Sequence, residues 1–422
     1  MKKITTRIAA VFAVFVLSVS YASAVDFGGL LGNDTIIKTN IDKDFKLDQK
    51  NFASLWFKQA FGQTGSNYFI AEAIYNFEND RDSDTVINAL DSDLFKLVLS
   101  AKKPAGTFNL SAGRFFYCDL SGLAYAQNAD GLLLSYKRPK IEVSLYGAYT
   151  GLLNAQNVKI LTSKEQAKDH GASYTDIFGQ THNIKDNYYF ELDTDKLYDP
   201  AEKYVVGAAA VSFLRLFAGQ TLSTQFLGTF RVEHEGYMRL YASLGLNGPI
   251  VKTLFYNFSS TLGIDNYNGD CTNFSNLTVA NLIYYAPVLS MRLQLNGSFA
   301  SGEYGNFGVF RGFTNMSATC SLTDIQYAGI AKCGLGLSLR PVQSLLFSAA
   351  TDFVFDASGD YYRNGSSADD DMATVGFQYN CGLNWQVVSD FMLGFNVSQY
   401  FDGDGSDSMN KTAFTLKAAL SF

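Results

Sequence analysis

The chain has 422 residues, of which 47% are hydrophobic, 15% aromatic and 17% charged, and its formal net charge is −7. The acidic balance argues against nucleic acid as a partner. After residue 24, no stretch approaches the ~20 apolar residues that a membrane helix requires. The length suits two ordinary domains or one large barrel.

The first residues have the pattern of an export signal. Residues 1–7 carry Lys2, Lys3 and Arg7, residues 8–19 are almost wholly apolar, and Ala22 and Ala24 provide an A-x-A cleavage pattern. This predicts a signal peptide over residues 1–24, because the apolar core is too short to span a membrane; a retained membrane helix is the alternative. Removal of the three basic residues changes the net charge from −7 to −10. For residues 25–422, a closed β-barrel is then the one membrane-spanning structure left.

Segments with a period of two recur along the chain. In "VLSMRLQLNGSF" and "ATVGFQYNCGLNW", apolar residues alternate with polar or small ones. Each segment has about ten residues, the length of a tilted transmembrane strand, whereas strands of soluble sandwiches usually have about five or six. The pattern therefore predicts transmembrane β-strands.

Eighteen such strands are predicted. In chain order they are 34–40, 52–61, 68–77, 94–101, 107–115, 131–137, 141–150, 203–212, 215–222, 236–246, 251–262, 276–285, 288–299, 327–339, 343–355, 373–386, 388–400 and 411–422. Without 34–40 and 215–222 the count is sixteen, which is also even, as such barrels require. We therefore predict an all-β fold, a closed antiparallel transmembrane β-barrel of sixteen to eighteen strands with no second domain.

The connectors between these strands alternate between short and long. Five short ones contain proline, which cannot donate to a sheet ladder: "KKPAG", "KRPK", "NGPI", "YAPV" and "RPVQ"; "QVVSD" is a sixth. The long, polar ones are 78–93, 117–129, 151–202, 263–275, 301–325, 356–371 and 402–410. This predicts short periplasmic turns on one side and long extracellular loops on the other. The loops are acidic, so we expect a negative potential at the outer mouth.

The last segment, "KTAFTLKAALSF", also alternates and ends on Phe422. With the signal peptide, the strands and the one-sided turns, it resembles bacterial outer-membrane β-barrel proteins. "GRFF…QNADGLLLSY", residues 113–136, is similar to a strand–loop–strand segment of substrate-diffusion porins. The family's Gly-rich loop signature is not evident in 151–202. The resemblance implies that Phe422 is read by the barrel-assembly machinery and that outer-membrane lipids surround the barrel, and it leaves a homotrimer open.

The inward face predicts the function. Its Gly, Ser, Asn and Thr residues indicate a water-filled lumen, because barrels of this size leave a channel unless something fills them, and no plug-sized segment is evident. The charged residues expected to line the pore are Lys58, Lys96, Arg239, Arg292, Lys332 and Lys417, with Glu72, Glu142 and Asp352. Six positive and three negative charges leave +3. We therefore expect passive diffusion of small hydrophilic solutes or ions, with a weak anion preference at high salt that weakens or reverses at low salt.

Few residues suggest other chemistry. Cys271 and Cys320 fall in loops expected to be adjacent, so they form the preferred disulfide if one exists. No spacing resembles a metal site, and no cofactor or catalytic residue is predicted.

Two alternative functions remain. An adhesin or structural barrel would act through its long acidic loops. An omptin-like surface protease would set Asp169 and His170 against Asp369, Asp370 and Asp371 across the barrel mouth.

Overall fold

The computed structural model describes residues 25–40, 45–62, 65–80, 85–154, 173–175, 181–183, 197–201, 203–232, 237–267, 271–302, 308–314, 316–319, 322, 325–357, 360–363, 366–369, 374–403 and 410–422. The strands in these ranges are β1 (Val25–Asn40), β2 (Phe45–Phe61), β3 (Asn67–Asp80), β4 (Thr85–Asp91), β5 (Phe95–Lys103), β6 (Gly106–Cys118), β7 (Ala126–Lys137), β8 (Ile141–Tyr149), β9 (Ser173–Thr175), β10 (Thr181–Asn183), β11 (Tyr204–Phe213), β12 (Thr221–Arg231), β13 (Tyr237–Val251), β14 (Leu254–Tyr267), β15 (Cys271–Ala286), β16 (Met291–Ala300), β17 (Ile330–Val342), β18 (Leu345–Asp356), β19 (Asp360–Arg363), β20 (Ser366–Asp369), β21 (Thr374–Val388), β22 (Phe391–Asp402) and β23 (Lys411–Ser421). A 3₁₀ turn, η3 (Val288–Ser290), precedes β16. Within these ranges, no helix is long and apolar enough to cross a membrane.

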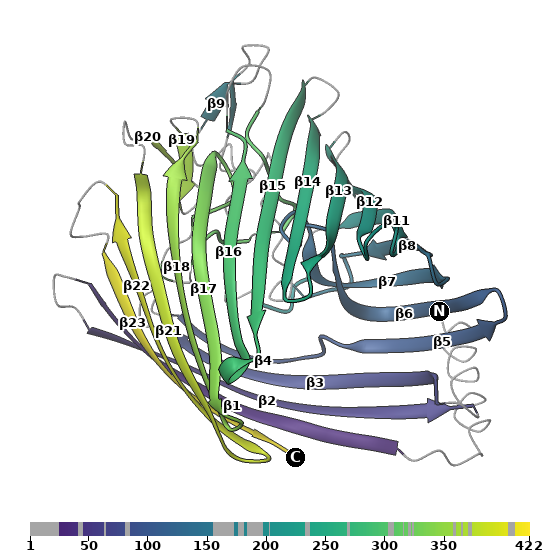
Figure 1. The fold of residues 1–422 in the computed structure, drawn as a ribbon, viewed down its shortest axis with the longest axis horizontal. Helices are drawn as coiled ribbons and strands as arrows, with labels where there is room; N and C mark the ends of the chain where they lie inside the picture. Colours follow the sequence, from purple (N-terminus) through teal and green to yellow (C-terminus); the bar gives the residue numbers. More distant parts are fainter. Residues whose placement is uncertain are drawn as a thin grey trace.

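The strands form one closed antiparallel barrel (Figure 1). Each wall strand pairs with the next one along the wall, and β8 pairs directly with β11. The wall closes where β1 pairs with β23, from Leu30 opposite Ser421 to Asn40 opposite Lys411. Both β4 and β5 pair with β3, so these two strands share one position in the wall. The nineteen-stranded sheet is thus an eighteen-stranded barrel, which confirms the predicted fold class and the upper strand number.

The period of two in the sequence becomes an apolar outside and a polar inside. In β16, the side chains of Leu293 and Leu295 are 41% and 50% exposed, and Gln294 between them points to the lumen and donates to Asn281 on the neighbouring β15. Lipid contains no water to solvate backbone groups, so a closed ladder with apolar side chains outside is the arrangement that a membrane allows.

Three sequence predictions differ from the structure in detail. The strand predicted at 215–222 is wrong, because Arg215 and Ala218 have positive φ angles of 55° and 47° and form a turn before β12. The first strand is longer than predicted and begins at Val25. Pro249 lies near the end of β13, beside a register shift, so the connector predicted around it is part of a strand. Its position fits the rule that proline occurs in sheets at bulges and edges.

Two connectors that were predicted as outer loops fold into the barrel. One, residues 119–125, joins β6 to β7, and the other comprises the described residues between β16 and β17, which are 301–302, 308–314, 316–319, 322 and 325–329. Their apolar side chains join inward-facing wall residues in one buried cluster, and Tyr125, Phe310 and Phe313 are fully buried. The core therefore lies inside the barrel and not between layers. No single plug-sized segment was predicted, yet two short segments fill part of the lumen.

Candidate functional site: the barrel lumen

The turn after β6 is shaped by one carboxylate. Asp119 Oδ2 accepts a hydrogen bond from the Ser121 amide (2.8 Å), and Oδ1 accepts from the amides of Ala124 (3.1 Å) and Tyr125 (2.9 Å). Gly122 has a φ of +69°, which closes the turn at little steric cost. Asp is well suited here because its short side chain reaches nearby amides. Hydrogen bonds within the turn thus fix its shape.

The second inward segment is anchored to β13. The Tyr241 hydroxyl donates to the Arg311 carbonyl (2.7 Å), and Arg239 Nη1 donates to the Gly312 carbonyl (2.7 Å). Arg239 is 1% exposed. It was predicted to line the pore, but in the structure it is covered by this segment and anchors it through the hydrogen bond from Nη1 to the Gly312 carbonyl.

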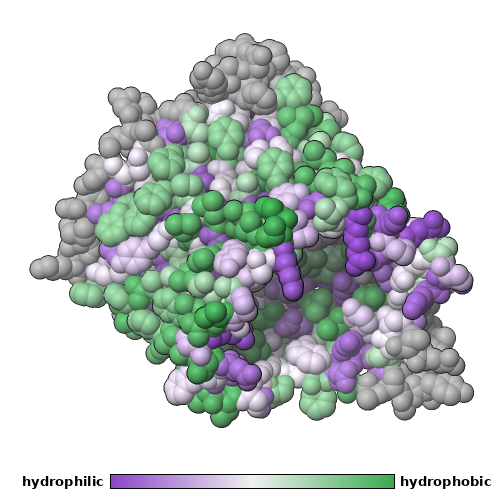
Figure 2. Space-filling view, viewed as in Figure 1, coloured by the Kyte–Doolittle hydropathy of each residue, from purple (hydrophilic) through white to green (hydrophobic). Residues whose placement is uncertain are grey.

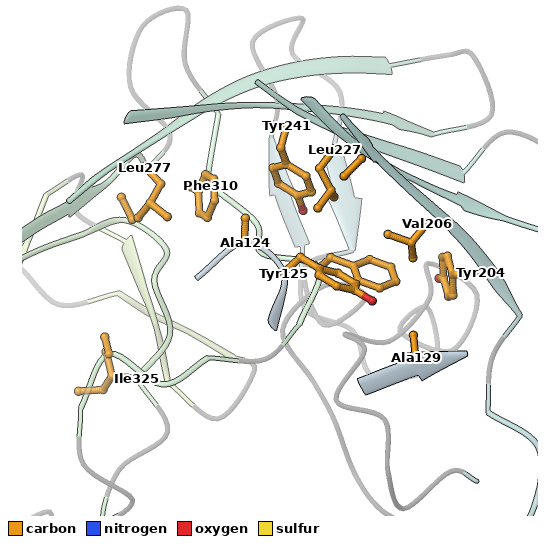
Figure 3. Packing of buried hydrophobic residues seen from close by; sticks show 14 of the residues in the cluster. Ala124, Tyr125, Ala129, Tyr204, Val206, Leu227, Tyr241, Leu277, Phe310 and Ile325 are labelled. Atoms are coloured by element: carbon orange, nitrogen blue, oxygen red, sulfur yellow. The ribbon is translucent and has the colours of Figure 1, made fainter. Parts of the chain in front are cut away.

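The two inward segments bind each other. The Phe313 amide donates to the Ala124 carbonyl (2.7 Å), and Thr314 Oγ1 accepts from the Ala126 amide (3.0 Å). The Phe313 ring stacks on Tyr125 at 5.8 Å and meets Tyr204 edge-on at 5.0 Å. Figure 3 shows Tyr125 between the segments and the wall residue Tyr204. These contacts close the part of the lumen beside β8 and β11 to β13.

The Tyr125 phenol is uncharged in this cluster. Burial raises the pKa of the Tyr125 phenol to about 12, although a hydrogen bond with the Tyr146 hydroxyl (3.3 Å) opposes the shift. The phenol is therefore neutral at any physiological pH, and the inward aromatic cluster adds no charge to the lumen.

A polar cluster lies on β16, β17, β18 and β21. Asp352 accepts from Asn296 (3.1 Å) and Gln378 (2.8 Å) and forms an ion pair with Lys332 at 3.4 Å. A Cβ on Gly334 would lie 2.0 Å from Asp352 Oδ1, so glycine makes the room for this carboxylate. Lys332 also donates to the Ala318 carbonyl of the second inward segment (2.7 Å). The ion pair thus joins the wall to that segment, and its two charges offset each other.

Lys58 and Lys96 lie at one level of the wall. Lys58 is opposite Ile70 on β3, and Ile70 is opposite Lys96 on β5, so the three side chains share the inward face. The ammonium groups lie over aromatic rings, Lys58 at 4.8 Å from Tyr68 and Lys96 at 4.7 Å from Phe115. In the described part of the chain, neither lysine has a carboxylate within ion-pair distance.

The other predicted pore residues are scattered around the wall. Lys417 pairs with Asp34 (2.8 Å), and Glu142 pairs with Lys137 (3.1 Å) near the short turns. Arg292 donates to Gln294 (2.6 Å), and the Glu72 backbone amide donates to Leu94 (2.9 Å). Among the nine predicted residues, the structure brings Lys332 with Asp352 and Lys58 with Lys96 into local groups.

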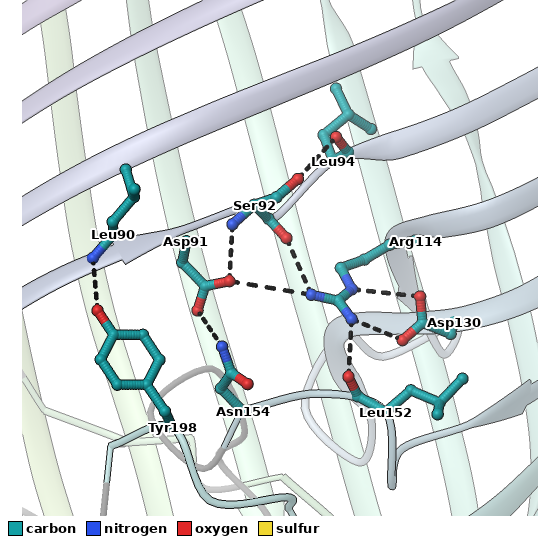
Figure 4. A network of polar contacts seen from close by, with 9 residues as sticks. All are labelled: Leu90, Asp91, Ser92, Leu94, Arg114, Asp130, Leu152, Asn154 and Tyr198. Carbon is teal, nitrogen blue, oxygen red and sulfur yellow. Dashed lines mark hydrogen bonds and ion pairs between the residues drawn. The ribbon is translucent and has the colours of Figure 1, made fainter.

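A network around Arg114 was missed by the sequence analysis. Arg114 binds Asp130 through two parallel hydrogen bonds of 3.2 and 2.9 Å, and donates to the carbonyls of Ser92 (3.0 Å) and Leu152 (2.9 Å). Arg114 lies at the break between β4 and β5, as Figure 4 shows. Arg114 and Asp130 both belong to the quoted "GRFF…QNADGLLLSY" segment, on two consecutive strands. Opposite charges at paired positions of neighbouring strands were the sequence signal that could have revealed this network.

This network closes a gap in the wall. Above Arg114, β4 pairs only with β3, and β6 pairs only with β7. Short segments at 151–154 and 197–201 lie between them: Asn154 donates to Asp91 (3.2 Å), and the Tyr198 hydroxyl accepts from the Leu90 amide (2.8 Å). The charges of Arg114 and Asp130 thus complete the wall and are not free in the lumen.

Several predictions fall outside the described residues. The Cys271 side chain and Cys320 do so, as do Asp169, His170, Asp370 and Asp371, so the disulfide and the protease arrangement stay predictions. Among the described residues, no group of three or more His, Cys, Asp or Glu could hold a metal ion. Phe422 lies at the seam between β1 and β23, where its amide donates to the Gly29 carbonyl (3.1 Å).

The barrel has a hollow that is visible from one side. Figure 2 shows a depression that opens among the short turns and is bordered by both polar and apolar residues. Lys58 and Lys96 lie on β2 and β5, and Lys96 is next to the buried cluster through its contact with Phe115.

The chain matches no family model and no curated protein. Solved structures of similar fold include OccK5 (OpdH) of Pseudomonas aeruginosa, with a TM-score of 0.58 and 11% identity over 94% of this chain and 98% of that chain. OccK2 (OpdF) of the same organism, in complex with glucuronate, has a TM-score of 0.56 and 13% identity over 94% and 96%. The P. aeruginosa outer membrane protein OpdK has a TM-score of 0.50 and 10% identity over 94% and 99%. At these identities, the likeness shows a shared barrel fold.

Proposed function

We propose that this chain is a channel of the bacterial outer membrane through which small hydrophilic solutes diffuse passively. The observation that carries the proposal is a closed eighteen-stranded barrel with an apolar outside and a lumen that is only partly filled. Barrels of this size leave an aqueous path unless something closes them. The likeness to outer-membrane barrels of P. aeruginosa supports the location and the architecture.

We further propose that the channel weakly favours anions. The charges of Lys332 and Asp352 offset each other, as do those of Lys417 and Asp34, whereas Lys58 and Lys96 have no ion-pair partner in the described part of the chain. A low-dielectric wall makes such fixed charges act more strongly than in water. The similar structure of OccK2 binds glucuronate, a carboxylate, which makes glucuronate a suitable probe for this chain.

Swelling of proteoliposomes in glucose or glucuronate tests the proposal. The two sugars differ by one carboxylate, so their rates separate passage from charge preference. We expect both to enter and glucuronate to enter faster at high salt. Planar-bilayer recordings under a salt gradient should give a weak anion preference that falls or reverses at low salt, when the acidic loops are less screened. No swelling and no conductance by folded protein would contradict the channel and favour the adhesin alternative.

A further inference from the structure

The rim of short turns carries a dense group of cations. Four consecutive turns, after β5, β7, β11 and β13, hold the exposed residues Lys102, Lys103, Lys137, Arg138, Lys140, Arg215 and Lys252. Among the described residues of these turns, the one acid is Glu142, which pairs with Lys137 at 3.1 Å. This part of the rim therefore has a formal charge of +6 in a chain whose net charge is −7. We name the seven residues the basic rim.

Hydrogen bonds join these turns into one surface. The Tyr136 hydroxyl donates to the Ala105 carbonyl in the preceding turn (3.0 Å), and the Leu214 amide donates to the Lys140 carbonyl (2.8 Å). Gln220 then donates to the Pro249 carbonyl (2.6 Å), which links the third turn to the fourth. Figure 2 shows hydrophilic residues gathered at the right of the view, where Figure 1 places the ends of β5 to β8.

Part of the basic rim faces the lipid side of the barrel. Phe108 and Tyr136 stack at 4.3 Å on the outer face, where aromatic rings mark the headgroup level of a membrane. The Arg138 guanidinium lies 5.3 Å from the centre of the Tyr136 ring, and its Nε donates to the Tyr136 hydroxyl. The two remaining nitrogens of Arg138 have no acceptor among the described residues. Arg138 therefore presents free donors at the level where lipid phosphates lie.

We propose that the basic rim binds the phosphate headgroups of anionic phospholipids in the inner leaflet, with Arg138 and Lys140 at the centre of the site. A guanidinium with two free nitrogens suits a phosphate, and the neighbouring lysines add a diffuse attraction. Lipid is favoured over a soluble anionic polymer because Arg138 is stacked on an outward-facing ring. The inference rests on the proposed membrane location and does not depend on conduction.

Native mass spectrometry of the folded full-length barrel tests the site. The protein in neutral detergent is titrated with phosphatidylglycerol and, separately, with phosphatidylcholine. The variant Arg138→Gln/Lys140→Gln removes two cations from the rim. Arg340→Gln/Lys411→Gln is the matched control, because it removes the same charge from the last residues of β17 and from the far end of β23. The heat-modifiable electrophoretic mobility of each variant shows that the barrel is folded, whether or not it conducts.

We expect wild type and control to retain phosphatidylglycerol in preference to phosphatidylcholine. The rim variant should need about 30-fold more phosphatidylglycerol for half occupancy, from about fivefold per cation. Phosphatidylglycerol retention by wild type should fall when the salt concentration is raised, because salt screens the attraction. This measurement tests the proposal without any variant. Equal retention by the rim variant would overturn the proposal. Soluble peptidoglycan fragments that bind through the same two residues, and compete with lipid, would overturn the assignment to lipid.

Discussion

Gly29 and Phe422 exchange two backbone hydrogen bonds, with N–O distances of 2.9 and 3.1 Å, and so close the last rung of the barrel between its first and last strands. A Cβ on Gly29 would lie 2.4 Å from Cζ of the Phe422 ring and 2.8 Å from the Ser54 carbonyl. The first strand thus leaves room for the terminal ring, which a side chain at position 29 would remove.

Deletion of Phe422 should lower the amount of protein in the outer membrane, and Gly29→Val should do so to a smaller extent. Deletion removes both the terminal ring and the hydrogen bonds, and an unpaired strand edge is costly in lipid. The measurement is the quantity of heat-modifiable barrel in outer-membrane fractions. Phe414→Ala, an exposed outward position in the middle of β23, is the control. Unchanged levels after deletion would contradict this account of the C-terminus.

Lys58→Gln/Lys96→Gln should shift the channel toward cations. Both ammonium groups lie over aromatic rings on the inward face, and their loss removes two positive charges from the lumen. We expect the ratio of glucuronate to glucose swelling rates to fall several-fold and the bilayer reversal potential to move in the same direction. Lys252→Gln removes a charge from the exposed turn after β13 and should change neither value. Unaltered selectivity in the double variant would place the selective charges elsewhere.

Phe313→Ala should loosen the inward segments and widen the channel. The buried ring contacts Tyr125 and Tyr204, so truncation should cost about 3–5 kcal/mol of unfolding free energy. Urea unfolding in micelles and single-channel conductance provide the two readouts. Phe299→Ala on the outer face removes a similar ring that is 43% exposed and should leave conductance unchanged. A destabilised barrel with unchanged conductance would mean that the aromatic cluster does not narrow the path.

Arg114→Lys should weaken the wall at the break between β4 and β5. Lysine cannot make the two parallel bonds to Asp130, nor reach the Ser92 and Leu152 carbonyls together. The expected loss is roughly 1.5–3 kcal/mol, since hydrogen bonds to charged groups have this magnitude. The midpoint of thermal unfolding in detergent measures the loss. Lys411→Arg is a matched control with the same pair of residue types. A midpoint equal to that of wild type would show that segments 151–154 and 197–201 close the wall without Arg114.

The alternation of the sequence predicted the barrel because lipid enforces it strictly. A strand with water on one side and lipid on the other must place apolar side chains at every second position, so the alternation in a segment such as 291–299 indicates both that it is a strand and which side chains face the lipid. The prediction failed at 215–222, where "RLFAGQ" is apolar in the middle but does not alternate, and the chain turns through Arg215 and Ala218. Apolar character without alternation does not distinguish a strand from a turn with apolar side chains.

The filling of the lumen could not be predicted in the same way. Whether residues 119–125 and the described residues between β16 and β17 turn inward depends on contacts between residues far apart in the chain, such as Phe313 with Ala124 and Tyr241 with Arg311. Asp119 and Gly122 are a local sequence signal for a turn, but no local signal shows that this turn points into the barrel. For Arg239, the alternation predicted its inward position on the wall. Its role as an anchor depends on the inward segment that covers it, which the sequence did not reveal.

Because β1 pairs with β23, the strands form a closed ring. The same ring could therefore be built from a chain whose termini lie in a different turn. A circular permutant could join Phe422 to Val25 and open the chain in the short turn at Pro104 and Ala105, which lies on the same rim. Every strand pair would be kept, but the last strand would become β5 and Phe422 would become internal. Such a molecule would separate two roles of the terminal phenylalanine, recognition at a chain end and completion of the ladder, which no point substitution can separate.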